Sequence, residues 1–444
     1  MFRLNLGNTK IPHNKNTANM KPVRMPPPTE VLLPMSQNIG SPAVPVVKIG
    51  DYVKVGQLIA DAGSAVSSPI YSSVSGNVVK IETYLRSDGN TVPAIRIASD
   101  GLMTVCEDIT PPTVTDTESF IAAIRASGIV GLGGAGFPTA IKMNVAPTAT
   151  IDTVILNGAE CEPYITVDTR TMIDDSSDIR DGIELLKKFI PGASKYVIAI
   201  EKNKPECIDE MNRVFSDDPM VSVKALPLRY PQGAEKVLIH TVTRRIVPEG
   251  KLPADVGTLV INVTTVAALA RYIKTGMPLV ERCITVDGSA INSPMNVIAP
   301  LGTSIRDIIE FTGGLKESAV KVIFGGPMTG SAANSLDEPV VKTTGAILAF
   351  SAKDAAEKPM TACIHCGRCV ESCPHLLEPT SFCKALDIND RKERFLRLED
   401  LKINLCIECG CCSYVCPANR PLVESNRIAK AFVREYKAHN ENLK

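Results

Sequence analysis

Residues 363–374 read CIHCGRCVESCP, and residues 406–417 read CIECGCCSYVCP. Both stretches follow the pattern C-x2-C-x2-C-x3-C-P, which is typical of modules that bind two [4Fe-4S] clusters. The first three thiolates of each stretch hold one cluster, and the fourth, just before the proline, ligates the other cluster. The spacing therefore predicts one cluster on Cys363, Cys366, Cys369 and Cys416, and a second cluster on Cys406, Cys409, Cys412 and Cys373.

A pair of structural zinc sites is the alternative, because C-x2-C pairs also bind zinc. The duplicated set of eight cysteines, each half closed by a proline, favours the clusters. Cys383 and Cys411 lie out of register with the two patterns, so we expect packed thiols rather than ligands. His365 and His375 flank sets that already have four thiolates, and we expect them to border the clusters without binding iron. A ferredoxin-type module of this kind carries single electrons and needs a redox partner.

The composition predicts a multidomain globular protein. The chain has 444 residues, and a prior of about 150 residues per domain gives roughly three units. Apolar residues make up 44% and charged residues 22% of the sequence, close to the average of soluble domains. Lys plus Arg and Asp plus Glu both total 48, and no basic stripe stands out, which argues against nucleic acid as a partner.

The sequence also bears on location. The N-terminal residues contain no apolar stretch of signal-peptide length, and nowhere do about 18 apolar residues follow one another as a transmembrane helix requires. We therefore expect a cytoplasmic protein with no transmembrane segment of its own, which reaches a membrane through partners. Fourteen cysteines in such a chain favour reduced thiols that bind metal or clusters over disulfides.

Glycines crowd residues 130–142, which read VGLGGAGFPTAIK. The stretch follows an expected helix over 118–127, and a helix is expected to start near Pro138. Taken alone, the loop favours a plain tight turn over a phosphate site, and it fits neither a Rossmann fingerprint nor a P-loop. A buried strand is expected over 152–157, and Asn157, Glu160 and Glu162 follow at its end. Open α/β sheets bind ligands at this edge.

Four motifs in chain order resemble the flavin-carrying, NADH-oxidising subunit of respiratory complex I. They are Gly-Phe-Pro-Thr with a lysine at 136–142, Asn-x-x-Glu-x-Glu-Pro at 157–163, Tyr-x-x-Gly-x-Glu at 230–235, and an Asn with Thr at 262–265. When bound, FMN accepts a hydride and releases single electrons. The resemblance implies that NADH faces Phe137, Glu162 and Glu235, with the two glutamates as catalytic residues. It further implies non-covalent FMN on Gly131, Gly133, Lys142, Asn157, Glu160, Tyr230, Gly233, Asn262 and Thr264.

The remaining segments resemble two further domains. Short strands with glycine turns over 30–100 are similar to a lipoyl-type barrel-sandwich, but the hairpin tip at 65–69 has no lysine to carry a cofactor. A structural or docking role is therefore expected there. A ββαβ unit over 281–350 resembles the β-grasp domain of complex I. We predict an N-terminal arm at 1–29, a barrel-sandwich hybrid domain at 30–110, a Rossmann-like FMN/NADH-binding domain at 115–280, a β-grasp (SLBB-like) domain at 281–350 and a two-[4Fe-4S] ferredoxin-type domain with a C-terminal helix at 355–444.

This order of domains is similar, over nearly the whole chain, to the peripheral C subunits of the Rnf ion-translocating electron-transport complex. The stretches 13–15, 36–42 and 409–417 fit that family closely. The resemblance implies NAD(H) as substrate, the other subunits of the membrane-bound complex as partners, indirect exchange with ferredoxin, and coupling to Na⁺ or H⁺ transport at the cytoplasmic side of the membrane. Two alternatives stay open: a cobalamin reductase of propanediol-utilisation microcompartments, and an iron–sulfur wire or scaffold without flavin.

Overall fold

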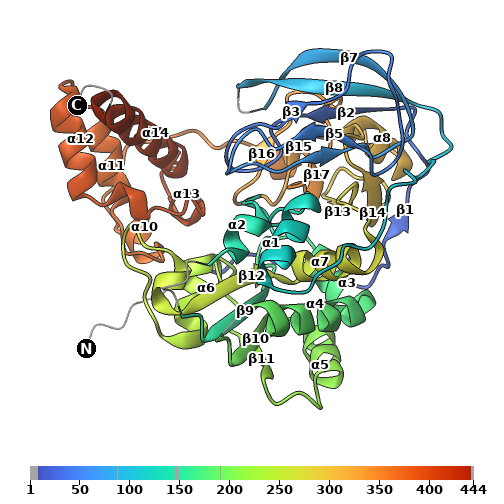
Figure 1. Cartoon of the computed structure of the whole chain (residues 1–444). Helices are drawn as coiled ribbons and strands as arrows, with labels where there is room; N and C mark the ends of the chain where they lie inside the picture. Colours follow the sequence, from blue (N-terminus) through green and yellow to red (C-terminus); the bar gives the residue numbers. More distant parts are fainter. Residues whose placement is uncertain (1–8, 88, 146–149, 191, 442–444) are drawn as a thin grey trace.

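The structure, a computed structural model, describes residues 9–87, 89–145, 150–190 and 192–441. Figure 1 shows four units, which we name the barrel-sandwich domain (30–99), the parallel-sheet domain (117–275), the β-grasp domain (281–351) and the cysteine module (359–441). The first three pack against one another, and the helices of the cysteine module stand to one side of them. The predicted mixture of α/β and α+β architecture is confirmed.

The parallel-sheet domain is built on four parallel strands in the order β11-β10-β9-β12. These are β9 (Thr153–Gly158), β10 (Lys195–Glu201), β11 (Val221–Leu226) and β12 (Thr258–Asn262). The central strand β9 is buried along almost its whole length, because helices cover both faces of the sheet. The helices are α1 (Thr117–Ala126), α2 (Thr139–Met143), α3 (Val167–Asp174), α4 (Ser176–Phe189), α5 (Pro205–Val214), α6 (Glu235–Thr243) and α7 (Val263–Thr275), with the short 3-10 helix η1 (Pro253–Val256).

Two core clusters hold this sheet between its helices. On one face, β9 and β10 pack against α1, α4, α5 and α7, with Phe120 and Tyr196 buried in the centre. On the other face, Leu238 and Ile239 of α6 pack against β9 and β12. Asn157 and Asn262 are paired in register at the carboxyl ends of β9 and β12. The expected strand over 152–157 thus delivers its polar residues to the sheet edge.

The β-grasp domain is a six-stranded sheet in the order β1-β14-β13-β17-β15-β16. The predicted ββαβ order is present and is extended by β16 and β17. Strand β1 (Val23–Arg24) pairs in parallel with β14, so the predicted N-terminal arm contributes an edge strand. The other elements are β13 (Glu281–Asp287), β14 (Met295–Pro300), α8 (Ile305–Phe311), β15 (Ala319–Phe324), β16 (Ser331–Ala332) and β17 (Ala346–Ser351).

The N-terminal arm also binds the parallel-sheet domain. The Lys15 ammonium donates to the backbone carbonyls of Glu160 at 2.8 Å and Glu162 at 2.9 Å. Asn16 donates to the Asp287 carboxylate of the β-grasp domain at 3.1 Å. The arm therefore ties the loop after β9 to the β-grasp sheet, which accounts for two polar residues of the stretch around 13–16.

The barrel-sandwich domain packs two small sheets face to face and shares its core with the β-grasp domain. Leu33 and Ile97 belong to the same apolar cluster as Ile284 and Val297. One sheet has the order β2-β8-β7-β4 and the other β3-β5-β6. The strands are β2 (Glu30–Pro34), β3 (Val44–Pro45), β4 (Tyr52–Val53), β5 (Leu58–Asp61), β6 (Ile70–Tyr71), β7 (Gly76–Leu85) and β8 (Thr91–Ser99).

The hairpin tip at 65–69 adjoins a buried lysine that joins three domains. Lys342 of the β-grasp domain donates to the Ser68 hydroxyl at 3.1 Å, the Pro69 carbonyl at 2.6 Å and the Gly128 carbonyl at 2.8 Å. Burial lowers the pKa of Lys342 to about 7. The place that carries a cofactor lysine in lipoyl domains is therefore a structural contact in this chain.

The cysteine module is helical and follows a linker that includes the short helix α9 (Ala352–Ala355). Its core is formed by Phe382, Leu398, Ile403 and Val433. The predicted C-terminal helix is present and is stabilised by packing on the helices before it. The elements are α10 (Arg368–Glu371), α11 (Pro379–Leu386), α12 (Arg391–Asp400), η2 (Ile403–Leu405), α13 (Cys411–Tyr414) and α14 (Leu422–Glu441).

Candidate functional site

The carboxyl ends of β9 and β12 open into a cleft of about 1230 Å³. All four units contribute to its walls: residues 36–39 of the barrel-sandwich domain, 133–137 of the parallel-sheet domain, 329–331 of the β-grasp domain, and 407–408 of the cysteine module. Ordinary small-molecule pockets measure roughly 300–1,000 Å³. The cleft is therefore larger than an ordinary pocket for one small ligand.

The glycine-rich loop forms one wall of the cleft and is fixed by hydrogen bonds. The Gly131 amide donates to the Phe137 carbonyl at 2.9 Å, which closes the loop. The Leu132 amide donates to the Thr265 hydroxyl at 2.9 Å. A Cβ on Gly133 would lie 2.9 Å from the side-chain nitrogen of Asn262, so a larger residue here would displace the Asn262 side chain. The loop is thus held against the start of α7 with its glycines on the cleft.

Most of the residues predicted to bind cofactor line this cleft. Lys142 at the end of α2 and Glu235 at the start of α6 form an ion pair, with 2.5 Å between Nζ and Oε1. Their side chains are 30% and 38% exposed, so both charges can reach a bound ligand. The predicted residues that line the cleft are Gly131, Gly133, Phe137, Lys142, Asn157, Gly233, Glu235 and Asn262.

Glu160 and Thr264 lie behind the cleft in the described structure and bind Asp168. The Glu160 side chain is 3% exposed, and its carboxylate accepts from the Asp168 amide at 2.7 Å and from the Thr169 hydroxyl at 2.6 Å, which caps the start of α3. Thr264 and Asn262 donate to the two carboxylate oxygens of Asp168 at 2.7 and 2.8 Å. Burial, together with the charge of Glu160, raises the pKa of Asp168 to about 6. These contacts position the sheet edge, so a role of Glu160 or Thr264 in binding FMN stays a prediction.

Glu162 and Tyr230 also lie outside the lining of the cleft that the described residues form. The Glu162 carboxylate accepts from the Met328 amide at 3.1 Å, the Thr329 hydroxyl at 2.6 Å and the Tyr230 hydroxyl at 3.2 Å. Burial raises the pKa of Glu162, and these three donors oppose that effect. Glu162 therefore joins the parallel-sheet domain to the β15–β16 turn, and its proposed contact with NADH stays a prediction of the resemblance.

The substitution Glu162→Ala tests this contact. Losing hydrogen bonds to a charged acceptor costs about 1.5–3 kcal/mol, so we expect the β15–β16 turn to open more often. Hydrogen exchange at Met328 and Thr329 should become roughly tenfold faster or more. Glu317→Ala, which removes an exposed carboxylate of the β-grasp domain that carries the turn, is the control. Unchanged exchange together with weaker NADH binding would favour the nicotinamide role instead.

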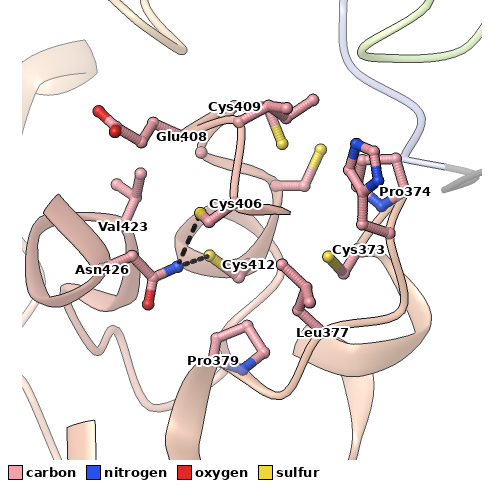
Figure 2. Close-up of a pocket in the computed structure, with 14 residues that line it drawn as sticks. Cys373, Pro374, Leu377, Pro379, Cys406, Glu408, Cys409, Cys412, Val423 and Asn426 are labelled. Atoms are coloured by element: carbon pink, nitrogen blue, oxygen red, sulfur yellow. Dashed lines mark hydrogen bonds between the residues drawn. The ribbon is translucent and has the colours of Figure 1, made fainter. Parts of the chain in front are cut away.

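In the cysteine module, the second predicted thiolate set surrounds a small hollow. Figure 2 shows Cys406, Cys409 and Cys412 around it together with Cys373, which comes from the other stretch. Within 9–87, 89–145, 150–190 and 192–441, no group of three or more His, Cys, Asp or Glu side chains is placed to hold a single metal ion. Four thiolates spaced around a hollow are instead the donor set of a cubane cluster. The residues present therefore fit a [4Fe-4S] cluster.

The first thiolate set repeats the backbone of the second at an offset of 43 residues. Turns with positive φ aim successive backbone amides at an anionic site. Burial raises the pKa of the Cys369 thiol, and the nearby Cys366 and Cys416 add to the effect, so Cys416 lies with the first set. The matched turn positions are His365 and Glu408 (φ 54° and 56°), Gly367 and Gly410 (77° and 78°), and Leu376 and Asn419 (52° and 49°).

The two cysteines outside the patterns are packed thiols, and one of them contacts the parallel-sheet domain. Cys411 is 1% exposed, and its thiol donates to the Tyr230 carbonyl at 3.8 Å. Cys383, like Cys369 and Cys416, packs against the cluster of Cys412, Leu422 and Val423. The contact of Cys411 brings the second thiolate set, rather than the first, next to the residues at the back of the cleft.

Several residues at the site were not found from the sequence. Arg86 and Tyr84 of the barrel-sandwich domain line the cleft, although no motif marks the hairpin that carries them. Asp168 accepts from Asn262 behind the sheet edge and reads in the sequence as an ordinary helix residue. Asn426 lies beside the second thiolate set, and the sequence offers one signal for it: the offset of 43 residues matches it to Cys383.

Family models match the chain along most of its length. The matches are described as the RnfC barrel sandwich hybrid domain at 6–102, the Nuo51 FMN-binding domain at 124–271, the SLBB domain at 283–332 and the 4Fe-4S dicluster domain at 359–420. The C subunit of the proton-translocating ferredoxin:NAD(+) oxidoreductase complex of Clostridium ljungdahlii is 43% identical over 82% of this chain and 80% of that protein. This chain belongs to the family of these C subunits.

Other members of the family are also similar to this chain over most of its length. The C subunit of the Na(+)-translocating ferredoxin:NAD(+) oxidoreductase complex of Acetobacterium woodii is 40% identical over 79% of this chain and 80% of its own length. The C subunit of the ion-translocating oxidoreductase complex of Pseudomonas aeruginosa is 39% identical over 97% of this chain and 55% of that protein. The predicted family is confirmed, and the chain is a component of an oxidoreductase complex.

The family models also bear on the cofactors and the fold of this C subunit. The FMN-binding and 4Fe-4S dicluster matches confirm the prediction of FMN and two clusters as cofactors. The barrel-sandwich and SLBB matches confirm the two other predicted domain types. Among the described helices of this C subunit, none is long and apolar enough to cross a membrane.

Proposed function

We propose that this chain exchanges electrons between NAD(H) and ferredoxin within the membrane-bound complex, through FMN and two [4Fe-4S] clusters. The observation that carries the proposal is the shared cleft: Ile407 and Glu408 of the cysteine module line the same cavity as the glycine-rich loop and Glu235. In this proposal, the site of hydride chemistry adjoins the module that carries single electrons. The names of the relatives, which include ferredoxin and NAD(+), support the same pair of substrates.

FMN is proposed to lie along the glycine-rich loop and the edge of β9 and β12. When bound, FMN takes up a hydride and releases electrons one at a time. The exposed backbone of Gly131 and Gly133 permits close approach, and the side chains of Asn157 and Asn262 offer amide donors and acceptors at the strand ends. Lys142 supplies a cation for a ligand phosphate or flavin carbonyl.

NAD(H) is proposed to occupy the outer part of the cleft beside Phe137 and Glu235. The Phe137 ring offers an apolar face for stacking, and Glu235 can accept hydrogen bonds from ribose hydroxyls. The barrel-sandwich domain closes the opposite wall with Tyr84 and Arg86. We propose that this wall shields the bound nucleotide from water.

The two thiolate sets are proposed to relay electrons between the cleft and a partner. The second set adjoins the cleft through Cys411 and Ile407, and the first set lies near the surface, where Cys366 and Ile364 are exposed. We propose that another subunit docks at this outer end on the cytoplasmic side of the membrane. Transport of Na⁺ or H⁺ is assigned to the membrane subunits.

Anaerobically prepared protein should contain FMN at up to about one per chain, released on denaturation. Lys142→Ala should weaken FMN binding roughly tenfold or more, because a charge-assisted hydrogen bond is lost. Lys195→Ala, an exposed lysine on β10, is the control. The measurement is flavin fluorescence against protein concentration, followed by NADH-driven bleaching of the bound flavin. Protein that binds no FMN at micromolar concentration would leave only the iron–sulfur wire, and FMN that NADH does not bleach would exclude the nicotinamide assignment.

A further inference from the structure

Asn426 is a buried amide whose donor group faces the second thiolate set. It lies on α14 and is 2% exposed. Its side-chain nitrogen is 3.5 Å from the Cys406 sulfur and 4.0 Å from the Cys412 sulfur, as the dashed lines in Figure 2 show. Its oxygen is buried and has no hydrogen-bond partner in the described part of the chain. The hydrogen bonds of this side chain in the described structure are therefore those from its nitrogen to the two sulfur atoms.

Cys383 occupies the position in the first half of the module that matches Asn426 in the second half. The offset of 43 residues that relates Cys373 to Cys416 also relates Cys383 to Asn426. Cys383 lies on α11 and, like Cys369 and Cys416, packs against the apolar cluster of Cys412, Leu422 and Val423 between the two halves of the module. An amide N–H is a good hydrogen-bond donor, whereas a thiol is a weak one. The two halves of the module therefore repeat in backbone and ligands but differ in the donor offered at this position.

We infer that Asn426 raises the reduction potential of the second cluster and that Cys383, in the equivalent place, leaves the first cluster at a lower potential. The inference rests on the proposed cluster ligands. Reduction adds one electron, and part of its charge spreads onto the thiolate sulfurs. A hydrogen bond to those sulfurs stabilises the reduced form more than the oxidised form, which makes the potential less negative.

The two thiolate sets differ in their place relative to the cleft. The second set adjoins the cleft, and the first lies at the outer end, where Cys366 is exposed. A strong donor near the cleft and a weak donor near the surface make reduction easier toward the cleft. This order assists electrons that arrive from an external partner of low potential and leave toward the nucleotide.

The experiment is a redox titration of the full-length, cluster-loaded protein, followed by electron paramagnetic resonance. Asn426→Leu keeps the branched shape of the side chain and removes the donor. We expect one midpoint to become more negative by an amount equivalent to a roughly threefold to thirtyfold change in the one-electron equilibrium constant. The other midpoint should stay in place. Cys383→Asn adds a donor at the first cluster and should move the lower midpoint upward.

Iron content and Glu424→Ala serve as controls, since Glu424 is an exposed side chain on the same helix α14. Wild-type protein without two clusters would contradict the proposed function itself. Two intact clusters whose midpoints are unmoved by Asn426→Leu and by Cys383→Asn would overturn the inference alone. If Asn426→Leu does not load its cluster, Cys383→Asn decides: a raised midpoint supports the inference, and an unmoved one rejects it.

Discussion

Cys416→Ser is expected to remove the cluster whose other ligands are Cys363, Cys366 and Cys369, and to leave the second cluster in place. The fourth thiolate of each stretch is expected to cross to the other set. Cys416 lies near Cys369 and packs with it against the cluster of Cys412, Leu422 and Val423, and Cys373 lies at the hollow of the second set. A serine hydroxyl is not ionised at neutral pH and is a poor replacement for a thiolate. The variant should lose about half of its iron, because one of two cubanes is lost.

The reciprocal substitution, Cys373→Ser, tests the same crossing of ligands from the other side. Cys373→Ser should remove the cluster of the second set, so the two variants should lose different spectroscopic signals in the reduced protein. Cys411→Ala is the matched control, because this buried cysteine directly precedes a ligand and should be dispensable for both clusters. Iron determination and electron paramagnetic resonance are the measurements. A Cys416→Ser protein that loses the signal removed by Cys406→Ser would show that the ligands do not cross.

The parts of the site that the sequence predicts are those that short-range patterns determine. The spacing of three thiolates fixes one tight loop, and the same turn recurs at His365 and Glu408 with nearly equal φ. Likewise, a buried strand that ends in a polar residue places Asn157 at the sheet edge wherever a parallel neighbour such as β12 exists. Local pattern and final structure agree at these positions because few long-range contacts are needed.

The direction of the Glu162 side chain could not be predicted from the sequence. The motif places its backbone at the correct edge, but the direction of the carboxylate is decided by Met328 and Thr329, which lie 166 and 167 residues further along the chain. No periodic pattern in the sequence predicts such a contact between domains. Strand β1 is a similar case, since its two residues are exposed and become a strand only by pairing with β14.

The positions of the Asn426 and Arg86 side chains could not be predicted from the sequence for a different reason. A polar residue on an amphipathic helix such as α14 usually faces solvent, and only the packing of α14 on the second thiolate set turns Asn426 inward. Arg86, which follows β7 in one domain, lines the cleft together with the strand ends of another domain. Both positions depend on how domains dock.

Glu235→Ala is expected to raise the NADH concentration needed for half-maximal flavin bleaching, while FMN and iron content stay normal. Glu235 lies on the cleft and pairs with Lys142 across 2.5 Å. A partly exposed ion pair of this kind is worth only about 0–1 kcal/mol, so a nucleotide can take over the carboxylate at little cost. The lost hydrogen bond to a charged acceptor is worth about 1.5–3 kcal/mol, which corresponds to roughly a tenfold to hundredfold loss of affinity.

Asp255→Ala is the matched control for this prediction, because Asp255 also lines the cleft but lies outside the four motifs. Its removal should leave the NADH dependence within about threefold of the wild type, as expected for a surface carboxylate without a ligand contact. Bleaching of bound FMN and NADH-dependent reduction of ferricyanide both report on the nucleotide site. If Glu235→Ala bleaches at the same NADH concentration as the wild type while Asp255→Ala does not, the nucleotide contacts the η1 side of the cleft and not the start of α6.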